Sequence, residues 1–127
     1  MLSSSPNPAT ASIAVVDDDA SVRRSLTNLF DSLGFMVAAF ESAEEFLASD
    51  SSSHTGCLIL DVELPGMSGL ELLERLSRAD NRIGVVMLTA HGDQQTRRRA
   101  VDLGADAFLC KPFRSDELIQ SVKRNLG

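Results

Sequence analysis

Tryptophan and tyrosine are absent from this sequence of 127 residues, and cysteine occurs only twice. The chain therefore has no Trp or Tyr ring to stack on a flavin, and no Gly-rich phosphate-binding loop follows its first apolar run. These absences count against a flavin-binding protein. Cys57 and Cys110 are far apart and show no C-x-x-C spacing. Because each lies beside an apolar run, we expect two reduced, buried thiols.

Long apolar runs and an excess of basic residues are also missing. No apolar run approaches the ~20 residues that span a bilayer. The N-terminal segment has neither the basic nor the apolar region of a signal peptide. The net charge of −6 argues against nucleic acid as a direct partner of the domain. We therefore expect a cytoplasmic protein that contacts neither membrane nor nucleic acid through this domain.

The length and composition fit one globular domain with a hydrophobic core. Hydrophobic residues make up 43% of the chain and charged residues 24%, which is the balance of an ordinary folded domain. Residues 1–11 are rich in Ser, Pro and Ala and are predicted to be a disordered tail. Residues 12–127 are assigned to the single domain.

Strands and helices are predicted to alternate along the chain. Five short apolar runs predict strands at residues 13–16, 35–39, 57–60, 85–88 and 107–110. Helical spacing of apolar residues predicts helices at 20–33, at 42–47, after the loop 62–68, from Asp93 to 103 and from Ser115 to 126. Residues 50–56 read as a polar loop. Short, continuously apolar strands are typical of burial on both faces, so we expect an α/β, doubly wound parallel sheet of (βα)5 type.

The termini of several predicted helices carry recognisable signals. Gly34 and Gly104 follow the first and fourth helices as stop signals. The pattern Ser42-x-x-Glu45 predicts a capping box at the start of the second helix. Ser115 is expected to be the N-cap of the last helix.

Reactive side chains fall at the ends of the predicted strands. They are Asp17, Asp18, Asp19, Asp61, Thr89 and Lys111. Because the carboxyl ends of parallel strands share one edge of the sheet, we expect these residues to gather there.

Such a cluster has a definite chemistry. Neighbouring carboxylates repel, and one of them would hold a proton unless a cation intervenes. Mg²⁺, with Mn²⁺ as a substitute, suits a site of a few carboxylates, waters and a phosphate. The hydroxyl of Thr89 and the ammonium of Lys111 can hold phosphate oxygens, so the set indicates phosphoryl transfer.

Each of these residues also has an ordinary structural interpretation. Asp19 could simply cap a helix, Thr89 could cap a strand end, and Lys111 could be a solvated loop lysine before a proline. These interpretations explain the joint occurrence at four separate strand ends poorly, and we therefore favour the site.

Five short motifs carry a resemblance to a known family. They are Val15-Val-Asp-Asp18, Leu60-Asp61, Pro65-Gly-Met-Ser-Gly69, Leu88-Thr89-Ala90 and Lys111-Pro112-Phe113. In this order and spacing they resemble the receiver domain of two-component response regulators, from about Ser12 to Leu126. The segment Thr89-Ala-His-Gly-Asp93 is most similar to FixJ-type receivers. The resemblance implies a flavodoxin-like or CheY-like fold with strand order 2-1-3-4-5.

The resemblance also implies a role for each site residue. Asp61 would accept a phosphoryl group from a sensor histidine kinase or a phosphotransfer protein. Asp18 would bind Mg²⁺ directly, Asp17 mostly through water, and Asp61 and the backbone carbonyl of Glu63 would complete the protein ligands.

Other positions would read out the phosphoryl group. Lys111 would pair with it, and Thr89 and Ala90 would contact it and carry the signal. Phe108 stands where many receivers place a switch aromatic, often a tyrosine. As a phenylalanine it can still change rotamer, but it has no hydroxyl to anchor either position.

Two further positions flank the expected phosphoryl site. Glu63 lies two residues after Asp61, and His91 lies two residues after Thr89. We hypothesise that this pair tunes dephosphorylation by controlling how an attacking water is placed. The alternative is that both are exposed loop side chains.

Partners follow from the same resemblance. FixJ-type receivers usually precede a DNA-binding helix-turn-helix, whereas this chain stops after its fifth predicted helix. We favour an output domain removed from a transcription regulator over a single-domain receiver. The basic run Arg97-Arg-Arg99 is either a solvated helix face or part of a docking surface. That surface, made by the fourth helix, fifth strand and fifth helix, could also support a phosphorylation-dependent homodimer.

A competing class is a Mg²⁺-dependent phosphohydrolase of the haloacid dehalogenase type. Asp61-Val-Glu63 imitates the D-x-D motif of that class only loosely, and the chain has no room for a cap domain. We therefore expect no enzyme beyond self-phosphorylation and self-dephosphorylation. Because the fourth strand would lie between the strands of Cys57 and Cys110, a disulfide between them is not expected.

Overall fold

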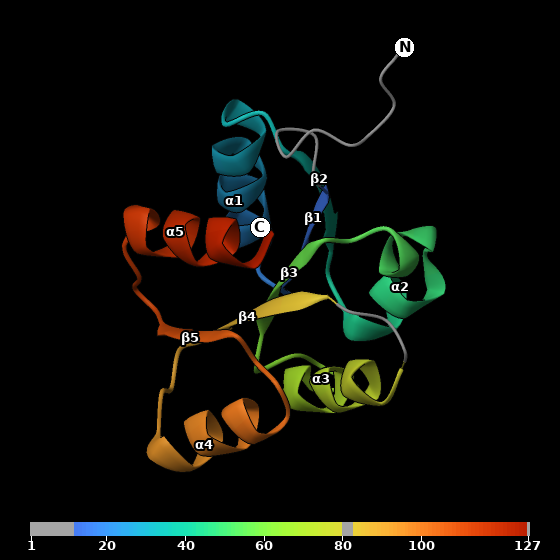
Figure 1. Ribbon diagram of the computed structural model, residues 1–127, viewed down its shortest axis with the longest axis vertical. Helices are drawn as coiled ribbons and strands as arrows, with labels where there is room; N and C mark the ends of the chain where they lie inside the picture. Colours follow the sequence, from blue (N-terminus) through green and yellow to red (C-terminus); the bar gives the residue numbers. More distant parts are fainter. Residues whose placement is uncertain (1–11, 80–82, 127) are drawn as a thin grey trace.

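Parallel pairing of the five apolar runs builds the sheet. The computed structural model describes residues 12–79 and 83–126. Its elements are β1 Ser12–Val16, α1 Ala20–Ser32, β2 Met36–Phe40, α2 Ala43–Ala48, the 3₁₀ helix η2 Asp50–Ser53, β3 Cys57–Asp61, α3 Gly69–Arg78, β4 Gly84–Thr89, α4 Gln94–Asp102, β5 Ala107–Cys110 and α5 Ser115–Leu126. Every neighbouring strand pair is parallel, in the order β2-β1-β3-β4-β5. The predicted (βα)5 fold and strand order are confirmed (Figure 1).

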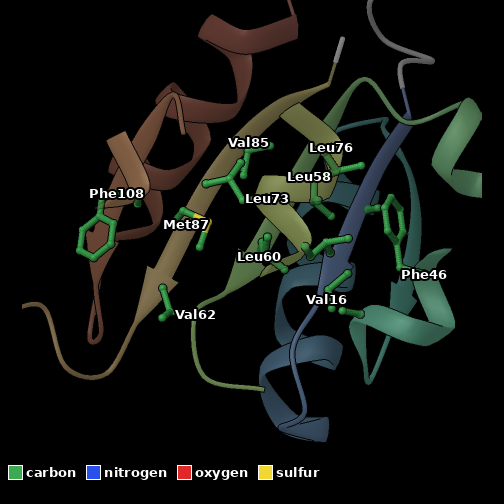
Figure 2. Packing of buried hydrophobic residues seen from close by; sticks show 14 residues of the cluster. Val16, Phe46, Leu58, Leu60, Val62, Leu73, Leu76, Val85, Met87 and Phe108 are labelled. Carbon is green, nitrogen blue, oxygen red and sulfur yellow. The ribbon is translucent and has the colours of Figure 1, made fainter. Parts of the chain in front are cut away.

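Helices cover both faces of this sheet and bury two apolar clusters. On one face, α2, α3 and α4 pack on alternate side chains of the central strands, among them Leu58, Leu60 and Met87 (Figure 2). On the other face, α1 and α5 pack on the intervening side chains, such as Ile59 and Leu88. Both faces of β3 are therefore buried, as a central parallel strand requires.

The expectation of burial on both faces is wrong for β2. Met36 is 64% exposed, and no residue of β2 is fully buried. The reason is that β2 is an edge strand, with a neighbour on only one side. Its start is also one residue later than predicted, because Phe35 precedes the strand and packs edge-on against Phe30 at 6.0 Å between ring centroids.

Helix termini agree with their sequence signals at most places. The side chains of Asp19 and Asp93 accept hydrogen bonds from backbone N–H groups in the first turns of α1 and α4. Ser68 and Glu71 form a full capping box at α3. Gly34, at φ 93°, ends α1 in the left-handed conformation that glycine adopts readily.

Three local predictions need correction. At α2 the capping box is only half formed, because Glu45 accepts from the N–H of Glu41 rather than from that of Ser42. Ser115 is the first helical residue of α5, not its N-cap. The loop 50–56 contains the short helix η2, which the Ser-rich segment forms after the Ser49 hydroxyl accepts from Ser51.

The two cysteines differ in exposure, so the prediction of two buried thiols is wrong for Cys110. Cys57 is buried on central β3, and burial, with the charge of Asp106, raises the pKa of its thiol to about 12. Cys110 is exposed, because it ends the edge strand β5. Both thiols are free, as expected. The predicted tail 1–11 lies outside the described residues, and no helix among the described residues is long and apolar enough to cross a membrane.

Candidate functional site

The strand-end residues meet at one edge of the sheet. Asp17 follows β1, Asp61 ends β3, Thr89 ends β4 and Lys111 follows β5. Three of these polar residues are nearly inaccessible, with exposed fractions of 1% for Asp17, 5% for Asp61 and 1% for Thr89. Burying such groups is unfavourable unless they are paired, so their contacts define the site.

Three carboxylates form the acidic part of the site. One oxygen from each of Asp17, Asp18 and Asp61 lies within 4.8 Å of the others. Asp17 is oriented by the backbone N–H of Asp19, which donates to its Oδ1 at 2.9 Å. This all-oxygen donor set fits a hard divalent cation such as Mg²⁺. Asp19 itself is turned away as the cap of α1, so its ordinary structural interpretation holds.

Lys111, which follows β5, extends its ammonium group to two of these carboxylates. Its Nζ lies 3.0 Å from Asp17 Oδ2 and 3.4 Å from Asp61 Oδ2. Burial alone would lower the pKa of Lys111, but the hydrogen bond and charge of Asp17, with the charge of Asp61, raise it above its ordinary value. The lysine is therefore a fixed cation between two buried carboxylates.

Opposing effects act on the carboxyl group of Asp61. Burial raises the pKa of its carboxyl above the ordinary value, and the charge of Asp17 adds to this rise. The N–H of Glu63, which donates to Asp61 Oδ1 at 3.1 Å, and the charge of Lys111 oppose the rise. A cation placed among these oxygens would relieve the repulsion.

Close packing at the end of β3 holds Asp61 in place. The N–H of Gly69 donates to the carbonyl of Val62 at 3.0 Å, so α3 begins directly against the strand end. A Cβ atom at position 69 would lie 2.1 Å from the backbone oxygen of Asp61. Position 69 therefore requires glycine, because α3 approaches the end of β3 too closely for any side chain. The Pro-Gly-Met-Ser-Gly motif contains this glycine, but the sequence alone does not show the close contact.

Thr89 does not point its hydroxyl at the acids. The hydroxyl donates to the backbone oxygen of His91 at 3.1 Å and accepts from the His91 N–H at 3.0 Å. Ala90 lies beside it, exposed. The backbone oxygen of Thr89 accepts from the N–H of Lys111 at 2.7 Å, which ties the ends of β4 and β5 together.

Glu63 and His91 contact each other, although 28 residues separate them in the chain. His91 Nδ1 lies 2.7 Å from Glu63 Oε2. Both side chains are largely exposed, and they link the loops after β3 and β4. Sequence reasoning selected both residues but did not foresee the contact.

Phe108, on β5, belongs to the apolar cluster that α2, α3 and α4 cover. It is 9% exposed, and its partner in the sheet register is Met87 of β4. Figure 2 shows its ring at the β5 edge of the cluster. The guanidinium carbon of Arg97 lies 5.9 Å from the centroid of its ring. Sequence reasoning treated Arg97 only as one member of a basic run.

Sequence reasoning also missed Glu44. Its Oε2 accepts from the backbone N–H of Met67 at 2.8 Å, and that contact lowers the pKa of Glu44 below its ordinary value. Gly66, at φ 74°, leaves room for the carboxylate, which would lie 2.6 Å from a Cβ atom there. No local pattern links a glutamate on α2 to a loop that begins much later in the chain.

Residues 13–123 match the response regulator receiver domain family. The chain belongs to this family.

Relatives and solved structures agree with this assignment. The receiver is 50% identical over 112 residues to nodulation protein W of Bradyrhizobium diazoefficiens, covering 88% of this chain and 49% of that protein. It is 40% identical over 120 residues to the transcriptional regulatory protein FixJ of Azorhizobium caulinodans, covering 94% of this chain and 57% of that protein. The crystal structure of FixJ-N matches with a TM-score of 0.83 and 35% identity, over 91% of this chain and 93% of that one.

These matches confirm the predicted resemblance to receivers, including those of FixJ type. Receivers take part in two-component signalling and are not, as a family, metabolic enzymes. The chain spans about half the length of the curated relatives it matches.

Proposed function

We propose that Asp61 is the phosphoryl acceptor of this receiver. The observation that carries the proposal is the pairing around its carboxylate, with the oxygens of Asp17 and Asp18 within 4.8 Å and the ammonium of Lys111 at 3.4 Å. An anionic phosphoryl group can approach a carboxylate only where positive charge offsets the repulsion between them. The ammonium of Lys111, and a cation held by the three carboxylates, would supply that positive charge.

Mg²⁺, or Mn²⁺ in its place, is the ion we propose for the acidic cluster. Asp17, Asp18, Asp61 and the backbone carbonyl of Glu63 would hold it, Asp17 mostly through water. When bound, the ion supplies positive charge that neutralises the carboxylates and the phosphoryl oxygens.

The transfer itself needs few protein groups. A carboxylate oxygen of Asp61 attacks the phosphorus of a donor phosphohistidine, so a new P–O bond forms while the P–N bond breaks. The histidine nitrogen keeps the bonding electron pair and takes a proton from solvent. Lys111 already lies 3.4 Å from the acceptor oxygen, from where its ammonium can pair with the incoming phosphoryl oxygens.

The signal leaves the site through Thr89. To donate its hydroxyl proton to a phosphoryl oxygen, Thr89 must give up its hydrogen bond to the His91 carbonyl, which rearranges the loop before α4. Ala90 follows Thr89 in that loop and would then contact the phosphoryl group. Phe108 changes rotamer with this movement, and the α4-β5-α5 face changes its shape.

We also propose that Glu63 and His91 tune dephosphorylation. Their contact of 2.7 Å bridges the loops that follow Asp61 and Thr89, and from there the pair would control how an attacking water is placed. Replacing either by alanine should change the half-life of phospho-Asp61. Equal lifetimes in Glu63→Ala, His91→Ala and the parent receiver would contradict this role and support two plain exposed side chains.

The phosphodonor is proposed to be a sensor histidine kinase or a phosphotransfer protein in the cytoplasm. A groove of about 470 Å³ between α1 and the segment after Lys111 has an apolar lining that includes Val22, Leu29 and Phe113. We propose this groove as a docking place for the donor protein. A DNA-binding output domain and a homodimer through the α4-β5-α5 face are the partners proposed downstream.

A small phosphodonor tests the acceptor. After incubation with acetyl phosphate and Mg²⁺, intact-mass analysis should show one added phosphate in the parent receiver and none in Asp61→Asn. Asp31→Asn, an exposed change on α1, is the matched control and should keep the label. A label retained in Asp61→Asn would overturn the assignment.

The same experiment separates a switch from a phosphohydrolase. Stoichiometric labelling supports a switch, whereas repeated phosphate release from a generic phosphomonoester would support the hydrolase. The pairing of the Glu63 carboxylate with His91 disfavours the hydrolase, because a D-x-D enzyme needs its second acid at the substrate.

A further inference from the structure

Three successive peptide groups carry the side chains of Asp17 and Asp18, and each peptide group has its own hydrogen bond. The N–H of Asp17 donates to the backbone oxygen of Phe40 at 3.1 Å, so β2 holds the first. The N–H of Asp19 donates to Asp17 Oδ1 at 2.9 Å, so an acid of the cluster holds the third. The second is the peptide between Asp17 and Asp18. It is held from outside the cluster by Arg23, whose Nη1 donates to the Asp17 carbonyl oxygen at 2.8 Å.

This middle peptide sets the direction of two carboxylates at once. Its carbonyl belongs to Asp17 and its N–H to Asp18, so a rotation of the planar group changes the backbone angles of both residues. The Asp17 side chain is buried and has a second anchor in Lys111 at 3.0 Å. Asp18, in contrast, is exposed. A contact that fixes the middle peptide therefore matters most for the placing of Asp18.

The fold fixes the position of Arg23 as well. Its N–H donates to the backbone oxygen of Asp19 at 3.0 Å, in the first turn of α1. Its Nη2 lies 3.8 Å from Glu41 Oε2, directly after β2, and its side chain is only 21% exposed. A guanidinium can contact a carbonyl and a carboxylate together because its donors form a planar fork. Arg23 thus joins the start of α1, the loop after β1 and the end of β2.

We propose that Arg23 is a positioning residue of the metal site, which holds the Asp17–Asp18 peptide so that both carboxylates are in place before a cation binds. The part that concerns the metal rests on the proposed function, whereas the ordering of the peptide does not. A positive charge near a cation site weakens binding by repulsion. Positioning has the opposite effect, because ligands that are already ordered lose less conformational freedom when they bind. The two effects of Arg23 therefore differ in sign.

The neighbouring arginine provides a matched control. Arg24 is exposed on the same helix and carries the same charge. Arg23→Gln and Arg24→Gln remove equal charge and keep a good helix former. Arg23→Lys keeps the charge but loses the planar fork, so any difference between it and the parent receiver reports geometry alone.

Titration calorimetry with Mg²⁺ measures the effect on the metal site. In Arg23→Gln, Mg²⁺ should bind about tenfold more weakly, the lower end of the loss when a group that orients a metal ligand is removed. In Arg23→Lys it should bind about two- to threefold more weakly. Arg24→Gln should bind Mg²⁺ no more weakly than the parent. If Arg23→Gln does not fold, as judged by circular dichroism, Arg23→Lys decides the question because its charge is unchanged.

A second measurement needs no metal. Amide hydrogen exchange in metal-free protein reports local opening of the Asp19 N–H, which donates to Asp17 Oδ1. Its exchange should be about three- to tenfold faster in Arg23→Gln than in the parent, because the preceding peptide is no longer held. Arg24→Gln should exchange at the parent rate.

Two results would overturn the positioning role. One is Mg²⁺ binding in Arg23→Gln and Arg23→Lys that is as tight as in the parent or tighter, which would leave only the charge. The other is an equal loss in Arg24→Gln, which would reflect a general effect on α1. Failure of the parent itself to bind Mg²⁺ would remove the proposed metal site, while the exchange rates would still show whether Arg23 orders the peptide. Normal binding by the parent without any Arg23 effect would remove only the role of Arg23.

Discussion

Identical side chains behave differently in this receiver according to their surroundings. Asp61 and Asp18 both belong to the acidic cluster, yet Asp61 is buried and Asp18 is exposed. Burial raises the pKa of the Asp61 carboxyl above its ordinary value. The charged form of Asp61 therefore destabilises the folded protein, although the proposed site needs that charge.

We therefore expect the substitution Asp61→Asn to raise the free energy of unfolding by an amount that depends on pH. The pKa of Asp61 is higher in the folded protein than its value of 3.8 in an unfolded chain, so folding favours the protonated carboxyl. This contribution to the free energy of unfolding is fully present below pH 3.8. It is lost as the pH rises through the pKa of the folded protein. At pH 7 without divalent ions, Asp61→Asn should therefore melt a few degrees higher than the parent. The gap should narrow as pH falls towards 4, as followed by circular dichroism.

Asp31→Asn is the control for this measurement, since it makes the same chemical change at an exposed position of α1. An equal Tm increase in both variants, or a gap that widens on acidification, would show that burial of the Asp61 charge is not the cause.

Lys111 competes with any cation for the same two carboxylates. Its ammonium lies 3.0 Å from Asp17 and 3.4 Å from Asp61, where it neutralises the oxygens that a metal ion would use. In Lys111→Met, Mg²⁺ should bind about three- to tenfold more tightly, because a like charge a few ångströms away is removed. Titration calorimetry measures the affinity.

Lys123→Met removes the same charge from the exposed last turn of α5 and serves as the control. If it tightens Mg²⁺ binding as much as Lys111→Met does, net charge rather than local competition is responsible.

At the scale of elements, the loop after β4 packs closely against the end of β5 because position 92 is a glycine. A Cβ atom at Gly92 would lie 2.0 Å from Cys110 Sγ. Thr89 and Cys110 are partners in the sheet register, so this contact sits at the strand ends that carry Thr89 and precede Lys111. The thiol takes up the space that a larger residue at position 92 would need.

Gly92→Ala should therefore destabilise the receiver by about 1–3 kcal/mol through overpacking. Cys110→Ala, which removes only an exposed thiol, should change stability by less than about 0.5 kcal/mol. The double variant should recover most of the loss, because the Cβ of Cys110 lies at 3.5 Å, an ordinary contact distance. Denaturant unfolding of the four proteins completes the cycle. Simple additivity would show that the two positions do not interact.

For the whole molecule, the sheet brings residues from widely separated parts of the chain to one edge. An ion held by that edge should stabilise the entire fold. At ten times its Kd, Mg²⁺ should add about 1.4 kcal/mol to the free energy of unfolding. A chelator should reverse the gain, and thermal melts with and without it measure the effect.

Asp18→Asn should abolish most of this stabilisation without harming the fold, since Asp18 is exposed. Asp31→Asn should retain it. A Mg²⁺ effect of equal size in both variants would point to general ionic screening instead of a site.

Much of the fold, and the gathering of Asp17, Asp18, Asp61 and Lys111 at one sheet edge, could be predicted because the signals are local. The apolar run before Asp17 and the run before Asp61 are read from neighbouring residues, as is the cap at Asp93. The edge position of β2 and the exposure of Cys110 could not be read in this way, since they depend on which strands have neighbours on both sides. An apolar strand at an edge looks the same in sequence as one in the centre.

The sequence by itself determined the strand ends at which the candidate residues lie and the chemistry expected of them, because the strand pattern and the short motifs are local properties. Only the tertiary structure decided how those residues meet. Lys111 beside Asp17, Glu63 beside His91 and Arg97 over Phe108 are contacts across loops and layers. Such contacts depend on the twist of the sheet and the placement of helices, which no spacing along the chain encodes.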